Sequence, residues 1–356
     1  VLENVHIHGN TGTYGAGIFM NDSSPTMIDC VIENNIPVTD NPSYPPRGGG
    51  MHLVDSSVDM TDCDITGHTD LDQGGGIFGS AIDTAPILFM TRGSVSGNTA
   101  AGGGAGMFIS DGEISLSSVT VNDNVMSPAA TFMYGGGIHA VGTIALVDSL
   151  KASGNSAHIG AAVHLADGSL ANISGSVLHG NNALLWGGGL HLSNIAGGTL
   201  EGNTVADNAG TASGGGGIYL SNSPVNLDRN LVAFNTGGPS FGNGVHFAGS
   251  AGTLTCNDVY GNASSDWGGV TDPTGTGGNI SADPLFCDLA TGKLNIQPTS
   301  PCDPAQSGGC GLIGALPSGC GLSPAPGMGD LPLAFKDDQN FPTPFNPKTT
   351  IRFDRP

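Results

Sequence analysis

Short glycine-rich clusters recur along this chain at intervals of 25 to 33 residues. The ten clusters are residues 15–17, 48–50, 74–76, 104–106, 135–137, 160–162, 187–189, 215–217, 242–244 and 268–269. A period in this range is typical of stacked supersecondary units, each of which buries its apolar side against the next. Gly supplies 60 of the 356 residues, but aliphatic side chains return at fixed places after each cluster. A disordered glycine-rich chain would not keep that register.

Each unit contains three short apolar pieces with no helical period between them. In one unit these pieces are residues 217–220, 225–227 and 231–235. They predict a solenoid of strands, in which like side chains stack at the spacing of about 4.8 Å that separates hydrogen-bonded strands. The residue directly after each cluster forms an inward ladder of Ile18, Met51, Ile77, Met107, Ile138, Val163, Leu190, Ile218 and Val245.

Two polar ladders accompany the apolar one. The first closes most units with Asn10, Asn35, Asn98, Asn124, Asn155, Asn181, Asn208, Asn235 and Asn262, and His68 replaces Asn once. Stacked amides bond to one another, and Asn tolerates the left-handed backbone of a sharp corner, so we expect a structural ladder. The second ladder consists of Asp22, Asp55, Asp111, Asp167, Asn194 and Asn222. We expect these side chains to cap a turn. Ca²⁺ held between Asp22 and Asp55 is the functional alternative, and no other cofactor is indicated.

The repeat resembles the right-handed β-helix proteins of the pectate-lyase-like superfold. Its Gly-Gly-Gly-Ile-His unit, at residues 135–139, is similar to repeats of polymorphic outer-membrane proteins and related bacterial surface proteins. The resemblance covers about residues 1–315 and implies an all-β chain, a right-handed parallel β-helix of about ten coils with a C-terminal cap. That fold hosts lyases, hydrolases, epimerases, adhesins and inert stalks, so it does not fix a function.

The remainder of the chain divides by composition. We assign residues 1–283 to the β-helix, 284–321 to a cap over the open end of the core, and 322–338 to a Pro- and Gly-rich linker. Residues 339–356 are similar to the opening strand of Ig-like sorting domains in type IX secreted proteins, an opening that FlgD-like Ig domains share. We expect this sequence to be part of a longer bacterial protein that is exported to the extracellular space or the outer cell surface.

Seven cysteines fit an exported protein, but they leave one odd thiol. Cys30 and Cys63 each fall thirteen residues after a cluster, so they should stack, either as packed thiols or as a disulfide. The cap contains a cluster of four, Cys287, Cys302, Cys310 and Cys320. One or two bridges there would staple a region with little core of its own.

The net charge of the chain restricts the classes of partner that it could bind. The formal net charge is -21, with only nine Lys and Arg, which disfavours nucleic acid, anionic membranes and polyanionic glycans. We also find no apolar run of the roughly 20 residues that would insert into a membrane.

The most informative surface is the strand after each cluster, because its residues alternate between the core and the outside. The outward position holds a column of rings: Phe19, His52, Phe78, Phe108, His139, His164, His191, Tyr219 and His246. The residues just before the clusters add further rings, above all Trp186, with Tyr14, Tyr134, Phe241 and Trp267. Bare glycine backbone flanked by rings suits the face of a sugar. The structural alternative is that the rings only extend the stack and shield the strands.

Catalysis on this fold would need an acid and a base on the same outer strand. His52 with Asp55, and His164 with Asp167, are the only pairs that we would test, although both pairs also follow from the ladders. Stacked histidines suggest a metal, but no carboxylate completes a tetrahedral site beside them. We therefore expect a non-catalytic surface stalk or adhesin-like module that binds glycan along the ringed face. The alternative is a polysaccharide lyase, hydrolase or epimerase.

Overall fold

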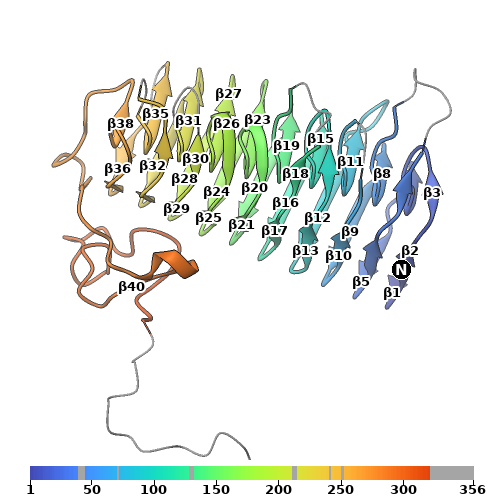
Figure 1. The fold of residues 1–356 in the computed structure, drawn as a ribbon, viewed down its shortest axis with the longest axis horizontal. Coiled ribbons are helices and arrows are strands. Elements are labelled where there is room, and N and C mark those ends of the chain that lie inside the picture. Colours follow the sequence, from blue (N-terminus) through green and yellow to red (C-terminus); the bar gives the residue numbers. More distant parts are fainter. Residues whose placement is uncertain are drawn as a thin grey trace, which may run out of the picture. The chain divides into compact units, whose positions relative to one another are not determined.

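The glycine-marked units fold into stacked coils of parallel strands, which follow one another along the solenoid in Figure 1. The computed structural model describes residues 1–38, 45–69, 72–127, 132–210, 215–239, 242–249 and 252–320. One compact unit spans Val1–Gly319. The predicted linker and sorting-domain strand, residues 322–356, lie outside the described residues. Within the described ranges no helix is long and apolar enough to cross a membrane.

Three ten-stranded sheets, here called sheets I, II and III, form the sides of the solenoid. Sheet I contains β1 (Leu2–Glu3), β5 (Thr26–Ile28), β9 (Ser57–Thr61), β12 (Ile87–Thr91), β16 (Glu113–Ser117), β20 (Ile144–Asp148), β24 (Leu170–Ser174), β28 (Gly197–Glu201), β32 (Val225–Asp228) and β36 (Leu254–Thr255). Sheet II contains β2 (His6–His8), β6 (Val31–Glu33), β10 (Asp64–Thr66), β13 (Ser94–Ser96), β17 (Thr120–Asn122), β21 (Lys151–Ser153), β25 (Val177–His179), β29 (Thr204–Ala206), β33 (Leu231–Ala233) and β37 (Asp258–Tyr260). Sheet III contains β4 (Ile18–Asn21), β8 (Met51–Val54), β11 (Ile77–Ser80), β15 (Met107–Ser110), β19 (Ile138–Val141), β23 (Val163–Ala166), β27 (Leu190–Ser193), β31 (Ile218–Ser221), β35 (Val245–Ala248) and β38 (Trp267–Gly268).

Shorter sheets complete the coils. Sheet IV contains β14 (Thr99–Ala100), β18 (Val125–Met126), β22 (Ser156–Ile159), β26 (Asn182–Trp186), β30 (Ala209–Gly210) and β34 (Thr236–Gly237). At the N-terminal end β3 (Thr11–Gly12) pairs with β7 (Ile36–Pro37). The only antiparallel pair in the described residues is β39 (Phe286–Asp288) with β40 (Lys293–Ile296), which flank the 3₁₀ helix η1 (Leu289–Thr291). The predicted all-β parallel solenoid is therefore confirmed.

The predicted inward ladder is confirmed by the strand register of sheet III. Ile138 pairs with Val163, Val163 pairs with Leu190, and all three side chains are at most 2% exposed. The turn before each of these strands requires glycine. Gly135 has φ +60°, and a Cβ on it would lie 2.2 Å from the carbonyl oxygen of Ile138, so any other residue would clash with backbone.

The asparagine ladder is continuous and structural, but the left-handed conformation belongs to the residue before each ladder position and not to the ladder asparagines themselves. Asn155 donates its side-chain amide to Asn181 Oδ1 at 2.9 Å and to the carbonyl oxygen of Val121 at 2.8 Å. Asn181 repeats the pattern toward Asn208 and the carbonyl oxygen of Ala152. The amide groups are thus buried with their donors and acceptors paired, as a low-dielectric interior demands.

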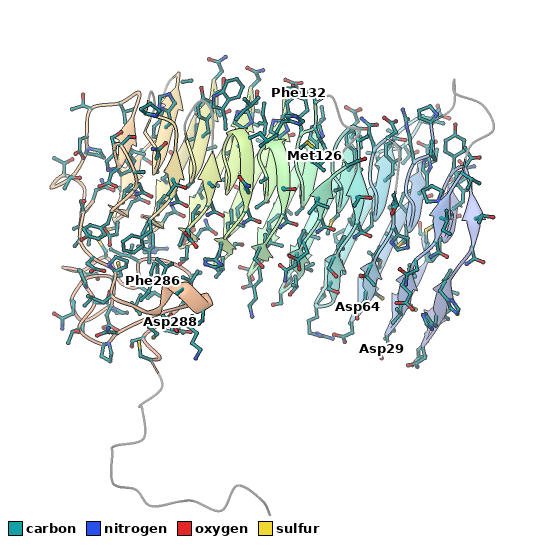
Figure 2. All side chains as sticks on the ribbon, in the orientation of Figure 1. Asp29, Asp64, Met126, Phe132, Phe286 and Asp288 are labelled. Carbon is teal, nitrogen blue, oxygen red and sulfur yellow. A yellow bond between two sulfur atoms is a disulfide. The ribbon has the colours of Figure 1, made fainter. Side chains whose placement is uncertain are left out.

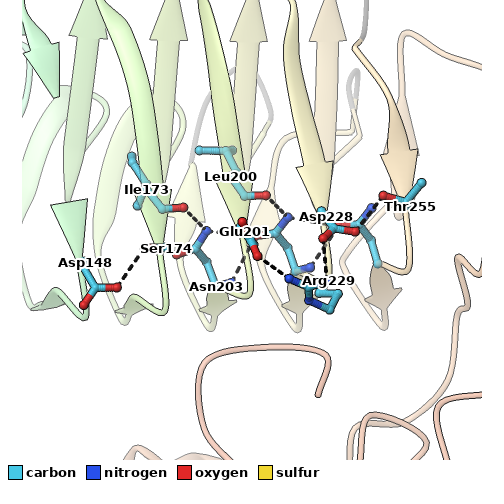
Figure 3. A network of polar contacts seen from close by, with 11 residues as sticks. Asp148, Ile173, Ser174, Leu200, Glu201, Asn203, Asp228, Arg229 and Thr255 are labelled. Atoms are coloured by element: carbon cyan, nitrogen blue, oxygen red, sulfur yellow. Dashed lines mark hydrogen bonds and ion pairs between the residues drawn. The ribbon is translucent and has the colours of Figure 1, made fainter. Parts of the chain in front are cut away.

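A second asparagine ladder, which the sequence analysis missed, lies between sheets I and II. It consists of Asn203, Asn230, Asn257 and Asn279. Figure 3 shows Asn203 bonded to the carbonyl oxygen of Ile173, with the exposed ion pair between Arg229 and Glu201 beside it. In earlier coils Cys30 and Cys63 occupy the corresponding turn. Both are buried free thiols, so of the two predicted states the structure has packed thiols and not a disulfide.

The ladder of short acidic and amide side chains occupies a turn, as predicted, and the backbone of that turn is left-handed. Its six members have φ between 45° and 54°. Asn194 donates to Asp167 Oδ1, and Asn222 donates to Asn194 Oδ1, both at 3.2 Å. These contacts link successive turns along the solenoid.

The C-terminal segment packs differently from the expected cap. We expected residues 284–321 to cover the open end of the core, but residues 286–313 pack against the outer face of sheet II. Ile296, Cys302 and Ile313 are buried there with Leu231 and Ala233 of β33. The outer face of sheet II is apolar at β33, so these three side chains are buried against it. Trp267 and Val270, in contrast, pack within the main core inside the solenoid. The first strand of this segment, β39, can be found in Figure 2 by its labelled residues Phe286 and Asp288.

Cysteines of the predicted cap form disulfides, as expected, but one bridge joins the cap to the last coil. Cys256, at the last coil, is bonded to Cys310 over a sequence separation of 54, so this bridge ties the segment to the solenoid. Cys287 and Cys320 are also disulfide-bonded, and Cys302 is a buried free thiol.

Candidate functional site

The predicted column of rings exists and follows the strand register of sheet III. Ring centroids of successive members are 4.7 to 5.4 Å apart, so each ring contacts the next. The column runs through Phe19, His52, Phe78, Phe108, His139, His164, His191, Tyr219 and His246. Alternation along each strand directs these side chains out of the apolar core.

Most of these rings are covered, although the sequence predicts an exposed stripe. Phe19 is 53% exposed, but the other eight members are between 2% and 9% exposed. The residues that precede the glycine turns cover them. Tyr134 stacks on His164 with centroids 4.9 Å apart, and Trp186 stacks on Tyr219 at 5.7 Å. The ring column therefore forms a second packed layer outside sheet III.

A groove of about 500 Å³ opens beside this layer over the middle coils. It is lined by Tyr134, His139, Val141, Ile159, His164, Ala166, Asp167, Trp186, His191, Ser193, Asn194, Tyr219 and Ser221. The lining comes from three columns: the residues before the glycine turns, the rings, and the second outward residue of each sheet III strand with the turn that follows. The volume falls within the range of small-molecule sites.

The imidazoles in the groove have unused hydrogen-bonding atoms. His139 Nδ1, His191 Nδ1 and both nitrogens of His164 are buried and have no hydrogen-bond partner within the protein. Trp186 Nε1 is likewise buried without a hydrogen-bond partner within the protein. Buried polar groups are normally paired, so this concentration beside one groove calls for an explanation.

Burial also fixes the charge of these imidazoles. Desolvation is the main cause that lowers the pKa of His139 and of His191 from 6.5 to about 3, and the charge of His191 contributes to the value for His139. The pKa of His164 is lowered well below 6.5, first by desolvation and then by its two histidine neighbours. At neutral pH each ring is uncharged and offers one N–H donor and one acceptor nitrogen.

The two candidate catalytic pairs are not assembled as acid and base. His164 and Asp167 both line the groove, but neither nitrogen of His164 is hydrogen-bonded to Asp167. Asp55 Oδ1 accepts instead from the backbone N–H groups of residues 82–84 at 2.7 to 3.0 Å. These bonds lower the pKa of Asp55. Desolvation lowers the pKa of His52 to about 4, which makes it a weak base.

The two candidate calcium ligands belong to the turn ladder described above. Asp22 and Asp55 are both in left-handed turns, with φ of 49° and 48°. The backbone bonds to Asp55 Oδ1 stabilise the following loop. In the described part of the chain, no group of three or more His, Cys, Asp or Glu side chains could hold a metal ion.

The structure gathers only part of the predicted ring set at the groove. Phe19, His52, Phe78, Phe108 and His246 belong to the column but do not line the groove. Of the rings that precede the clusters, Tyr134 and Trp186 line the groove. The ring of Tyr14 contacts that of His52, with centroids 5.3 Å apart, and Trp267 lies in the main core. Phe241 lies outside the described residues. The sequence analysis missed Ser193, Asn194 and Ser221 as groove residues, although Ser193 and Ser221 lie two positions beyond a ring on the same face.

Comparison with known proteins gives one match. The model of the family described as "right handed beta helix region" matches residues 1–156 and 131–281. No curated protein and no solved structure matches the chain significantly.

Proposed function

The chain belongs to the right-handed β-helix family, and from this premise we propose that it is a non-catalytic glycan-binding module that uses the groove along sheet III. The observation that carries this proposal is the lining of that groove, in which the rings of Tyr134 and Trp186, three imidazoles and small polar side chains lie together. A sugar hydroxyl both donates and accepts, as a neutral imidazole does, so hydroxyl groups are suitable partners for these rings.

The other lining residues support the same ligand class. Trp186 and Tyr134 offer aromatic faces for the C–H surface of a pyranose. Ser193, Asn194 and Ser221 add neutral hydrogen-bonding groups on the opposite side. Asp167 and the formal net charge of -21 disfavour a polyanionic chain, so the proposed ligand is a neutral glycan.

A binding role is favoured over a catalytic one by the state of the histidines. A general base works best when its pKa lies near the operating pH, and burial lowers the pKa of His139 and His191 to about 3. His164 has no carboxylate partner to orient it. These rings are suited to hydrogen bonding and poorly suited to proton transfer at neutral pH.

We place the module in an extracellular or outer cell-surface protein, as a stalk or adhesin-like unit of a longer chain. The Cys256–Cys310 disulfide supports this placement, because such bonds persist in oxidising compartments.

A glycan array followed by calorimetry with the strongest neutral glycan tests the proposal. We expect Trp186→Ala to weaken binding at least about tenfold, because it removes one stacking face. The matched control is Leu184→Ala on the same strand, β26, whose side chain is 40% exposed and does not line the groove. The control should bind like the wild type.

The same glycans should be incubated with the protein to detect cleavage. The proposal expects neither new reducing ends nor unsaturated products. Products that form with the wild type and disappear in His164→Ala would overturn the non-catalytic account and favour the polysaccharide-processing alternative. An array without any glycan bound would overturn the glycan-binding account.

A further inference from the structure

A second surface lies on the outer face of sheet I and shares no residue with the groove lining. Phe89 on β12, Ile144 and Leu146 on β20, and Leu170 on β24 are 39% to 43% exposed. We call these four side chains the sheet I patch. Ile144 pairs directly with Leu170, while Ser115 lies between Phe89 and Leu146 in the strand register. Single exposed apolar residues are ordinary, whereas a group of them on one sheet face is a candidate docking surface.

The backbone beneath the patch is already fully used. β16 and β20 each pair in parallel with a strand on both sides, so no edge is open for strand addition. A partner must therefore contact the side chains from above. The patch also lacks aromatic faces beyond Phe89, which makes it a poorer platform for sugars than the groove.

The dimensions of the patch favour a helix. It spans three strand spacings from β12 to β24, about 14 Å, and two residues along a strand, about 7 Å. Three turns of an α-helix are about 16 Å long and present a narrow apolar stripe. A helix that lies across the strands would match the long dimension of the patch.

Charge decides which kind of helix fits. Asp59 pairs with Phe89, Glu113 pairs with Ile144, and Asp148 lies on the same strand as Leu146. None of the strands β9, β12, β16, β20 and β24 contains Lys or Arg. The formal net charge of -21 opposes a second copy of this chain on the patch and favours a cationic partner.

A rigid apolar loop lies just before the first strand of the patch. Ile82 is 76% exposed, yet the backbone N–H groups of Ile82, Asp83 and Thr84 all donate to Asp55 Oδ1 at 2.7 to 3.0 Å. Because this backbone is already held, only the side chain of Ile82 has to be ordered when a partner binds. The loop leads into β12, the first strand of the patch.

We propose that the sheet I patch docks a basic amphipathic α-helix of a partner protein. The apolar stripe of that helix packs on all four side chains of the patch, from Phe89 to Leu170. Its Lys or Arg side chains flank the stripe and face Asp59, Glu113 and Asp148. This surface is independent of the groove, so the proposal stands whether or not the groove binds a glycan.

Fluorescence anisotropy of the whole chain with a labelled 18-residue helical peptide of Leu and Lys tests this proposal. We expect the Ile144→Ser/Leu146→Ser double variant to weaken binding at least about tenfold, because two apolar contacts are lost. Leu184→Ser on sheet IV is the matched control, since Leu184 and Leu146 are both 40% exposed. It should bind within about twofold of the wild type, since it lies outside the contact surface.

Peptide controls separate docking from simple charge attraction. A scrambled peptide of the same composition, without a continuous apolar stripe, should bind much more weakly, and a Leu and Glu peptide should not bind. Equal binding of the scrambled peptide, or of the double variant, would overturn the proposal. Thermal denaturation should show equal stability for all variants, because the substituted side chains are exposed.

Discussion

His164 stacks on His191 in the next coil, with ring centroids 4.8 Å apart and ring planes within 7° of parallel. Both rings are at most 5% exposed. Two imidazolium ions could not occupy these positions together, because like charges at that distance repel strongly in a buried site. The stack is therefore stable only while its rings are neutral.

Acid should destabilise the solenoid through these histidines. Their pKa values in the folded chain are lowered, to about 3 for His139 and His191, whereas unfolded histidine titrates at 6.5. The unfolded state therefore binds more protons, and stability is complete above pH 6.5 and falls as the pH drops below it. At pH 5 each such ring should cost about 2 kcal/mol. Urea midpoints between pH 7.5 and 4.5 should show this decline.

The variant His191→Gln is the control for this acid effect. It removes one buried titrating ring, so its urea midpoint should depend less steeply on pH than that of the wild type. Equal slopes for the two proteins would show that His191 is not buried as a neutral ring.

Asp258 should act in the opposite direction on the C-terminal segment. Its side chain accepts from Cys302 Sγ and from the backbone N–H of Ala282, both at 3.0 Å, and burial raises its pKa from 3.8 to about 7. Asp266 and Asp283 add to the rise. The folded state therefore binds more protons between pH 3.8 and 7, so this contribution is present in acid and is lost as the pH rises to 7.

Hydrogen exchange of residues 282–296 measures this effect. Their protection, compared with that of the stable coils, should fall between pH 5 and pH 8 after correction for the intrinsic rate. In Asp258→Asn the fall should be absent, because the amide does not titrate. A pH-dependent fall that persists in this variant would contradict the assignment to Asp258.

Breaking the Cys256–Cys310 bridge should release the C-terminal segment. The bridge closes a sequence separation of 54, for which loop entropy alone is worth about 4 kcal/mol. We expect Cys256→Ser/Cys310→Ser to be cut by proteases within residues 284–319 much faster than the wild type. The coils before β33 should remain resistant, and their loss of protection would show that the segment stabilises the whole solenoid.

The asparagine ladder should be the most sensitive polar feature of the coils. Asn181 Oδ1 accepts from the backbone N–H and the side-chain amide of Asn155, so Asn181→Ala leaves two buried donors unpaired. We expect a loss of about 2 to 4 kcal/mol in the free energy of unfolding. Asn172→Ala, on the exposed face of β24, should change it by less than about 0.5 kcal/mol. Denaturant unfolding of both variants checks this contrast.

The repeat made the fold predictable from sequence, because each glycine turn fixes which residues enter the core. Ile138, Val163 and Leu190 follow their clusters directly, and the structure places them in one buried column. The second asparagine ladder was equally visible in the spacing of Asn203, Asn230 and Asn257, each 27 residues from the next. These units thus carry two stacked asparagines each, one at either end of the sheet II strand.

The state of the candidate site could not be predicted in the same way. Alternation along a strand fixes the side of the sheet on which His164 lies, but not whether another residue covers it. Tyr134 covers it from the preceding turn, and Trp186 similarly covers Tyr219. Likewise, no local pattern indicates that Leu231 and Ala233 of sheet II receive the C-terminal segment, since that contact depends on distant residues.

The most direct test of the glycan-binding account is nitrogen NMR of the imidazole of His164 during titration with the neutral glycan that binds best on the array. The account predicts that the His164 ring nitrogens shift in proportion to occupancy and remain those of a neutral ring at pH 7. Saturable binding that leaves the nitrogen signals of His139, His164 and His191 unchanged would contradict it.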